Sequence, residues 1–169
     1  MTYFLFYLFH RLLRKDRRDR DIPLLPFCLL LLIARDPSDI SSLYAYGLHA
    51  LLLYQALSDH LSEEISMIPD LFIILIGIVC SVRAGRPLPD LFLSFLLPLT
   101  LYLLSLSGKI GDGDAEVFFA LSFYYSLYPL ALILFTSSFL ALLYSYIEKR
   151  DRYPFVPFIF ISSILIYSL

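Results

Sequence analysis

The segment at residues 88–107 reads LPDLFLSFLLPLTLYLLSLS, and Asp90 is its only charged residue. A helix needs about 20 mostly apolar residues to cross the hydrocarbon core of a bilayer. The apolar side chains of this segment are continuous. A strand of a membrane β-barrel would alternate them with polar ones. The segment therefore predicts a transmembrane helix.

The whole chain repeats this pattern. It has 169 residues, of which 59% are hydrophobic, whereas soluble domains contain about 45–50%. The charged residues, 17% of the chain, gather between apolar blocks. We therefore predict an all-α, polytopic transmembrane helical bundle of about 6–8 spans, forming one integral membrane domain over residues 1–169. The apolar blocks are 2–13, 22–34, 41–58, 69–82, 88–107, 115–128, 129–147 and 154–169.

Pro129 interrupts the apolar stretch 115–147. Because an internal proline kinks or ends a helix, this stretch is expected to form two helices. A tight turn is predicted near Tyr128 and Pro129.

The distribution of Lys and Arg predicts the orientation of the chain. If eight spans alternate, one face carries ten of the thirteen basic residues. The positive-inside rule assigns that face to the cytoplasm. Its connections are a basic loop at about 11–21, acidic loops at about 59–70 and about 107–116, and the segment 148–153. The acids expected at this boundary are Asp59, Glu63, Glu64, Asp70, Asp112 and Asp114.

Two acidic loops on one face suggest a chemistry. Amide hydrolysis without a metal can use one ionised carboxylate as the base that activates water, while a protonated carboxyl donates to the scissile carbonyl. Two close carboxyls raise one another's pKa, so that the pair holds one proton. The run Gly111-Asp112-Gly113-Asp114 supplies such acids beside flexible glycines. A simple turn or a calcium-like loop is the alternative interpretation of this run.

The sequence gives no support for a metal site. The chain has two cysteines, Cys28 and Cys80, and no Cys-x-x-Cys pair, and its three histidines are scattered. We expect no metal and no organic cofactor. We also expect no nucleic-acid partner.

The segment Gly111–Val117, followed by an apolar block, resembles the Gly-x-Gly-Asp signature of type IV prepilin peptidases and archaeal preflagellin peptidases, which are intramembrane aspartyl proteases. Three more segments resemble motifs of this family in the same order: Arg20–Phe27, Ile68–Asp70 and Tyr153–Phe158. The resemblance implies that Asp114 is the second catalytic aspartate, supported by Gly111 and Gly113. It also implies Pro69 and Asp70 as supporting residues.

The first catalytic aspartate is harder to place. The family usually has it seven residues before the proline of Ile-Pro-Asp, and that position is Ser62 here. Asp59 ends the apolar block 41–58, as the family's aspartate ends an apolar helix, so we predict Asp59 as the first acid. Glu63, one residue from the expected position, is the alternative.

Other departures limit what the resemblance implies. The region before Arg20 lacks the four cysteines of the longer enzymes, which puts methyltransferase activity in doubt. Glu116 stands where the family often has Lys, and Val156 where it has Gly.

The resemblance implies a prepilin leader peptidase, integral to the cytoplasmic (inner) membrane, whose active site faces the cytoplasm. Its partners would be a prepilin-like substrate and the lipid bilayer. The first alternative is a catalytically degenerate relative that acts as a membrane scaffold or assembly partner. A second alternative is a small transporter that uses the acids as a proton relay.

Three further residues carry expectations. Asp112 occupies the variable position of the motif and is predicted to be a solvated acid in a turn. Asp70 is predicted to cap a helix beginning at Leu71. His49 is predicted to form a hydrogen bond inside the bundle.

Overall fold

The computed structural model describes residues 40–62, 67–108, 110–148 and 154–168. These residues form helices joined by short connections, which confirms the all-α fold class for the described part of the chain. The helices are α3 (Ile40–Ser62), α4 (Met67–Arg83), α5 (Leu88–Ser105), α6 (Asp112–Ser122), α7 (Leu127–Glu148) and α8 (Val156–Ser168). The predicted blocks 2–13 and 22–34, the basic loop 11–21, the segment Arg20–Phe27 and Glu63 lie outside the described residues.

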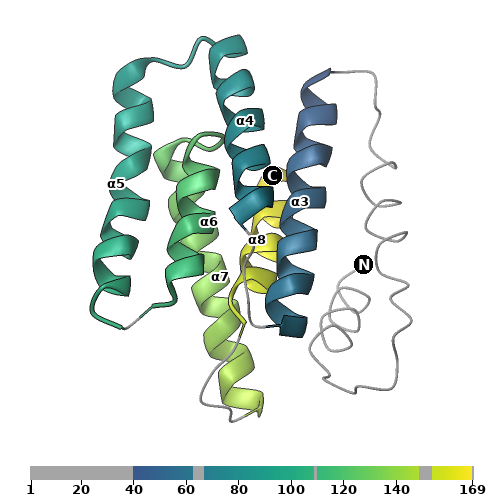
Figure 1. Cartoon of the computed structure of the whole chain (residues 1–169), viewed down its shortest axis with the longest axis vertical. Coiled ribbons are helices and arrows are strands. Elements are labelled where there is room, and N and C mark those ends of the chain that lie inside the picture. The colour runs from purple at the N-terminus through teal and green to yellow at the C-terminus, as the bar shows by residue number, and fades with distance from the viewer. Residues whose placement is uncertain (1–39, 63–66, 109, 149–153, 169) are drawn as a thin grey trace. The chain divides into compact units, whose positions relative to one another are not determined.

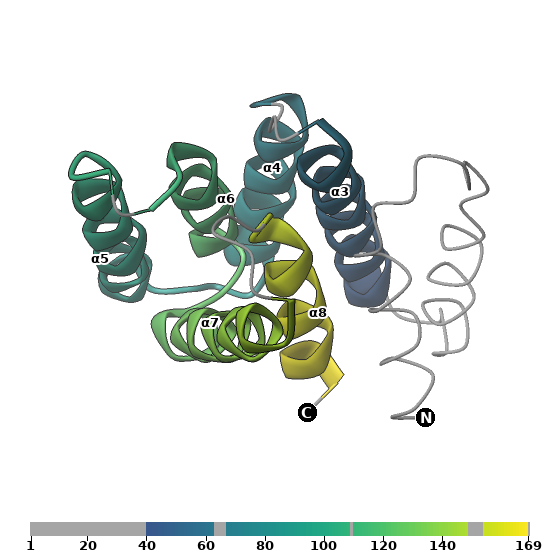
Figure 2. The same cartoon turned by 90° about the horizontal axis from the view of Figure 1, so that it is seen from below.

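Residues 43–169 form one compact unit, in which α6 lies between α4 and α5 and also contacts α7 (Figures 1 and 2). The helix α7 packs along α8. Side-chain contacts tie α3 to both α4 and α8: Gln55 bonds Asp70, and the ring of His49 lies against that of Tyr167. The short helix α6 is therefore surrounded by longer ones.

Within the part of the chain that the structure describes, two helices are long and apolar enough to cross a membrane, at Leu88–Ser105 and Leu127–Ile147. Many large apolar side chains on the helices are exposed, including Leu71 and Leu75 of α4 and Phe135 and Phe139 of α7. Exposed apolar surface on this scale suits contact with lipid. The 11 residues of α6 extend only about 17 Å, about half the thickness of the hydrocarbon core. The helix formed within the predicted block 115–128 is therefore shorter than a perpendicular span, and the number of spans stays a prediction.

Prolines explain two corrections to the expected helix boundaries. The chain turns at residues 123–126, and α7 already begins at Leu127, so the turn predicted near Tyr128 and Pro129 was placed too late. Likewise α4 begins at Met67, so Asp70 does not cap a helix beginning at Leu71. Pro129 and Pro69 each lie in the first turn of a helix, where a proline breaks no internal hydrogen bond.

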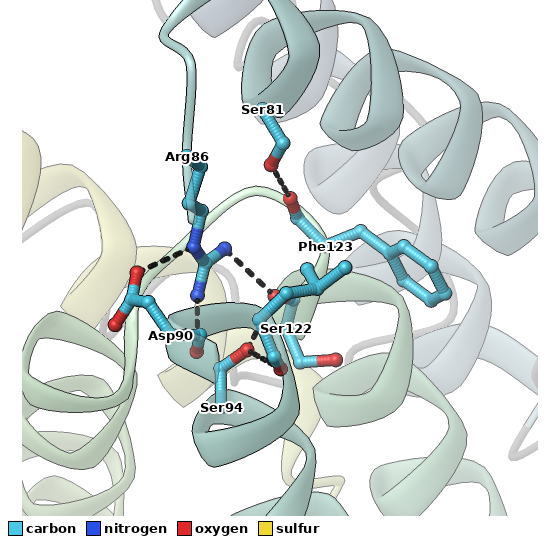
Figure 3. Close-up of polar contacts among 7 residues, drawn as sticks. Ser81, Arg86, Asp90, Ser94, Ser122 and Phe123 are labelled. Carbon is cyan, nitrogen blue, oxygen red and sulfur yellow. Dashed lines mark hydrogen bonds and ion pairs between the residues drawn. The ribbon is translucent and has the colours of Figure 1, made fainter. Parts of the chain in front are cut away.

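A clasp of three polar side chains holds the end of α6 (Figure 3). It consists of Ser81 of α4 and of Arg86 and Ser94 around the start of α5. The Ser122 carbonyl accepts hydrogen bonds from Arg86 Nη1 at 3.2 Å and Ser94 Oγ at 3.0 Å. The Phe123 carbonyl accepts one from Ser81 Oγ at 2.6 Å. The last carbonyls of a helix have no partner within it, and a positive charge there also suits the helix dipole. These contacts hold the C-terminal end of α6 against α4 and the start of α5.

We expect Arg86→Ala to lower the free energy of unfolding by about 1–3 kcal/mol, because it removes a charged hydrogen-bond donor from this clasp. It also removes the partner of Asp90, whose Oδ2 lies 2.6 Å from Arg86 Nε. Arg83→Ala is the matched control, since Arg83 is exposed and its guanidinium contacts Tyr44 by a 3.5 Å hydrogen bond to the hydroxyl and over the face of the ring. Thermal unfolding in detergent compares the two variants. Equal shifts would contradict the role given to Arg86.

Candidate functional site

Asp59 lies near the end of α3, with only 8% of its surface exposed. The backbone N–H of Val156, the first residue of α8, donates to Asp59 Oδ2 at 3.1 Å. The first N–H groups of a helix lack partners within it and favour a negative charge. The start of α8 therefore holds the Asp59 carboxylate in place.

Asp114 is the third residue of α6, and Gly111 precedes the helix as its N-cap. The backbone N–H of Gly111 donates to the Asp114 carboxylate, as in one half of a capping box. A Cβ at position 111 would lie 3.1 Å from Asp114 Oδ2. Glycine at this position therefore leaves room for the carboxylate to lie against the backbone. Gly113 is the second residue of the same helix.

The two aspartates influence one another electrostatically. The pKa of Asp114 is raised from 3.8 to about 7, mainly by burial and then by the charge of Asp59, while the Gly111 hydrogen bond opposes the rise. Asp114 lies outside the two candidate spans. The structure thus brings Asp59 and Asp114 within electrostatic reach, and Asp114 can hold a proton near neutral pH.

A second buried polar pair lies one turn of α3 away from Asp59. Gln55 Nε2 donates to Asp70 Oδ1 at 2.7 Å, and both side chains are buried. The negative charge of Glu116, on α6, also acts on Asp70. Asp70 therefore joins α4 to α3 rather than capping its own helix.

The family model described as "Type IV leader peptidase family" matches residues 46–146, more than half of the chain. The chain belongs to this family. No significant match was found among curated proteins or among solved structures. The resemblance noted in the sequence is therefore confirmed at the level of the family.

The members of the type IV leader peptidase family are aspartic peptidases. The matched range contains both Asp59 and Asp114, together with the pair Pro69-Asp70. Family membership and the apolar helices α5 and α7 indicate an integral membrane protein. The described residues contain no group of three His, Cys, Asp or Glu side chains that could hold a metal ion.

Three other residues with expectations from the sequence lie in α6, α4 and α3. Asp112 is exposed at the first position of α6, and Pro69 is buried in the first turn of α4. His49 Nδ1 donates to the Ala45 carbonyl at 2.7 Å, which confirms the hydrogen bond predicted for it.

Sequence reasoning missed Gln55 and the backbone donor at Val156. A signal for the first existed, because Gln55 is the only glutamine of the chain and interrupts an apolar block four residues before Asp59. Residues four apart share one face of a helix. The Val156 contact had no comparable signal, since any residue other than proline supplies the same backbone N–H.

The raised pKa of Asp114 predicts how stability depends on pH. Between pH 3.8 and about 7 the folded chain holds a proton that the unfolded chain has lost, so wild-type stability falls as pH rises through this window. Asn cannot ionise, so Asp114→Asn should melt at a higher temperature than wild type at about pH 8 and at nearly the same temperature at about pH 4. Thermal unfolding at the two pH values tests this. A variant that gains nothing at the higher pH would contradict it.

Proposed function

We propose that this protein is a membrane aspartic endopeptidase that removes the leader from prepilin-like precursors, with Asp59 and Asp114 as its two catalytic acids. The observation that carries the proposal is the pKa of Asp114, which burial and the charge of Asp59 raise to about 7. A carboxyl pair that holds one proton near neutral pH suits amide hydrolysis without a metal. The match to the leader peptidase family supports the same reaction.

The surroundings of the two acids give each a role. Asp59 accepts a backbone hydrogen bond at the start of α8, which favours its ionised form, so Asp59 is the base. Asp114 carries the proton and donates it toward the scissile carbonyl oxygen. Water loses one proton to Asp59 and bonds to the carbonyl carbon. When the intermediate collapses, Asp59 gives that proton to the leaving amine and Asp114 takes its own proton back from the hydroxyl.

The position of the acids agrees with a substrate whose leader stays on one side of the membrane. Both acids adjoin loops on the face that carries ten of the thirteen Lys and Arg residues, if eight spans alternate. The positive-inside rule makes that face cytoplasmic. We therefore propose cleavage at the cytoplasmic face of the inner membrane.

Asp59→Asn and Glu63→Gln together test which residue is the first acid. Each variant is produced with a prepilin, and the cleaved fraction is followed by mass spectrometry. We expect Asp59→Asn to slow cleavage by about 10²–10⁴-fold, the range that general acid–base catalysis supplies, and Glu63→Gln to cleave as wild type does. Loss of cleavage in Glu63→Gln alone would reassign the first acid to Glu63.

Ser62, in the position where the family usually has its first aspartate, favours a second candidate: a degenerate relative that acts as a membrane assembly partner. Val156, which stands where the family has Gly, gives no further support to this candidate. It contacts Asp59 through its backbone N–H rather than its side chain. Wild-type protein that leaves every prepilin uncut, while pilus assembly still requires it, would favour this second candidate.

A further inference from the structure

A pocket of about 720 Å³ lies between α4, α5 and α6. Most of the side chains that line it are apolar, and several of these are largely exposed, such as Leu96 and Leu99. Two carboxyl groups, Asp70 and Glu116, are the charged members of its lining. The pocket thus combines an apolar surface with a local acidic end.

Among the described residues, one oxygen of the carboxyl at the acidic end receives no hydrogen bond. Within the described residues, Asp70 Oδ2 is buried and has no hydrogen-bond partner, and the same holds for Oε1 of Gln55, which bonds Asp70 from outside the pocket lining. The side chains that carry them are 7% and 0% exposed. Both atoms are acceptors, and leaving a buried acceptor unpaired costs free energy. A ligand that fits this end must therefore donate hydrogen bonds.

The two carboxyl groups at this end also favour a positively charged ligand. The negative charge of Glu116 acts on Asp70, so two carboxyl groups lie within electrostatic reach of one another. Arg83 and Arg86, the arginines in the described part of the chain, lie thirteen or more residues after Asp70, about 20 Å along α4 or beyond its end. An ammonium or guanidinium group would supply both the missing donors and the missing charge.

We propose that this pocket binds the precursor substrate itself, with a Lys or Arg side chain of the leader at Asp70 and Glu116 and the apolar residues that follow along α4 and α5. The proposal rests on the proposed function, because it names the part of the substrate that the enzyme recognises. It gives Asp70 a role in substrate binding in addition to its bond with α3.

The geometry also places the basic residue close to the bond that is cut. Asp70 bonds Gln55, which lies four residues from Asp59 on α3, about 6 Å along the helix axis, and Glu116 follows Asp114 by two residues. An extended peptide advances about 3.3 Å per residue. The recognised Lys or Arg should therefore lie about two residues from the scissile bond.

Binding without cleavage tests the proposal. Purified Asp114→Asn protein in phosphatidylcholine nanodiscs is titrated with a fluorescent synthetic peptide, a Lys- and Arg-containing segment followed by an apolar helix of about 20 residues. A second peptide carries Gln at each basic position. We expect the basic peptide to bind about tenfold more tightly, as a charged hydrogen bond allows. Equal affinities would overturn the proposal.

Variants of the two acids locate the effect. Adding Asp70→Asn or Glu116→Gln should remove the difference between the two peptides. The amide oxygen introduced by Asp70→Asn can still accept the hydrogen bond of Gln55, so the tie between α3 and α4 is kept. A loss that is equal for both peptides would indicate a structural role for these acids and would overturn the proposal. Glu116→Arg should in turn prefer a peptide with Glu at the basic positions.

A matched pair on α5 tests the apolar part of the pocket. Leu96 lines the pocket and is 52% exposed, whereas Leu103 is 59% exposed and does not line it. Leu96→Trp should weaken binding of both peptides about tenfold by filling the pocket, and Leu103→Trp should leave binding unchanged. Equal effects of the two substitutions on peptide binding would contradict binding of the apolar residues in this pocket.

An amine-bearing lipid is the competing occupant. If phosphatidylethanolamine in the nanodisc blocks the pocket while peptide charge has no effect, the site is a lipid site and the proposal fails. The outcome is independent of catalysis. Basic-peptide binding that depends on Asp70, together with a wild-type protein that never cleaves, would overturn the proposed function and leave this site standing.

Discussion

Asp114→Asn is expected to lower the rate of leader cleavage by about 10²–10⁴-fold, the range that general acid–base catalysis supplies. Asn keeps the size of the side chain and an oxygen that can accept the Gly111 hydrogen bond, but it has no proton to give to the scissile carbonyl. The same variant should be more stable than wild type above neutral pH. Loss of activity with a gain in stability distinguishes a catalytic acid from a structural one. Cleavage of a purified prepilin, followed by mass spectrometry, measures the rate.

Asp112→Asn is the matched control for this experiment. Asp112 lies two residues away in the same helical turn and is also an aspartate, but its side chain is exposed. We expect the Asp112→Asn variant to cleave at the wild-type rate. Wild-type cleavage by Asp114→Asn, or equal losses in the two variants, would contradict the assignment of Asp114.

Gly77→Ala is expected to destabilise the protein strongly. A Cβ at position 77 would lie 2.7 Å from Phe123 Cβ and 2.8 Å from both the carbonyl carbon of Phe123 and the amide nitrogen of Tyr124. The backbone there cannot easily move, because Ser81 holds the Phe123 carbonyl. Overpacking of this kind costs about 1–3 kcal/mol or more. That exceeds the gain of about 1 kcal/mol that alanine gives over glycine inside a helix.

The displacement should also reach Asp114, the proposed catalytic acid on α6. Phe123, which meets Gly77 at the end of α6, is nine residues, about two and a half turns, beyond Asp114, so moving that end shifts the whole short helix. We therefore expect Gly77→Ala to reduce cleavage as well as the midpoint of thermal unfolding. Circular dichroism in detergent measures the midpoint.

Gly47→Ala provides the control for the glycine experiment. Its added Cβ would lie 3.3 Å from Ile76 Cδ1, the flexible tip of a side chain, with no backbone atom among its close neighbours. We expect its stability to equal or slightly exceed that of wild type, since alanine favours the helix. A destabilisation as large as that of Gly77→Ala would show that packing against Phe123 is not the cause.

The helical fold could be predicted from the sequence because long apolar runs without alternation leave few other structures. The boundaries were harder, and Pro129 shows why. A proline that would end a helix in its interior is tolerated in the first turn, and the sequence does not say in which of the two places it lies. Asp70 was similarly misjudged, because its tertiary bond with Gln55 replaces the local role that its position suggested.

The candidate site, too, could be predicted from the sequence only in part. The Gly-x-Gly-Asp motif pointed to Asp114, and the close approach of Gly111 to its carboxylate gives the motif a physical reason. Asp59 could be proposed because it ends an apolar block. The clasp at Arg86 could not be foreseen, since its partner is the backbone carbonyl of Ser122, thirty-six residues later. Backbone carbonyls carry no sequence signal.

The proposed hydrolysis depends on coupling between Asp59 and Asp114, and the pKa of the Asp114 carboxyl tests that coupling most directly. Isotope-edited infrared spectroscopy can follow the protonated carboxyl of Asp114 as pH is raised, in wild type and in Asp59→Asn. We predict titration at about pH 7 in wild type and at a distinctly lower pH once the charge of Asp59 is removed. Identical titration of Asp114 in the two proteins would contradict a coupled catalytic pair.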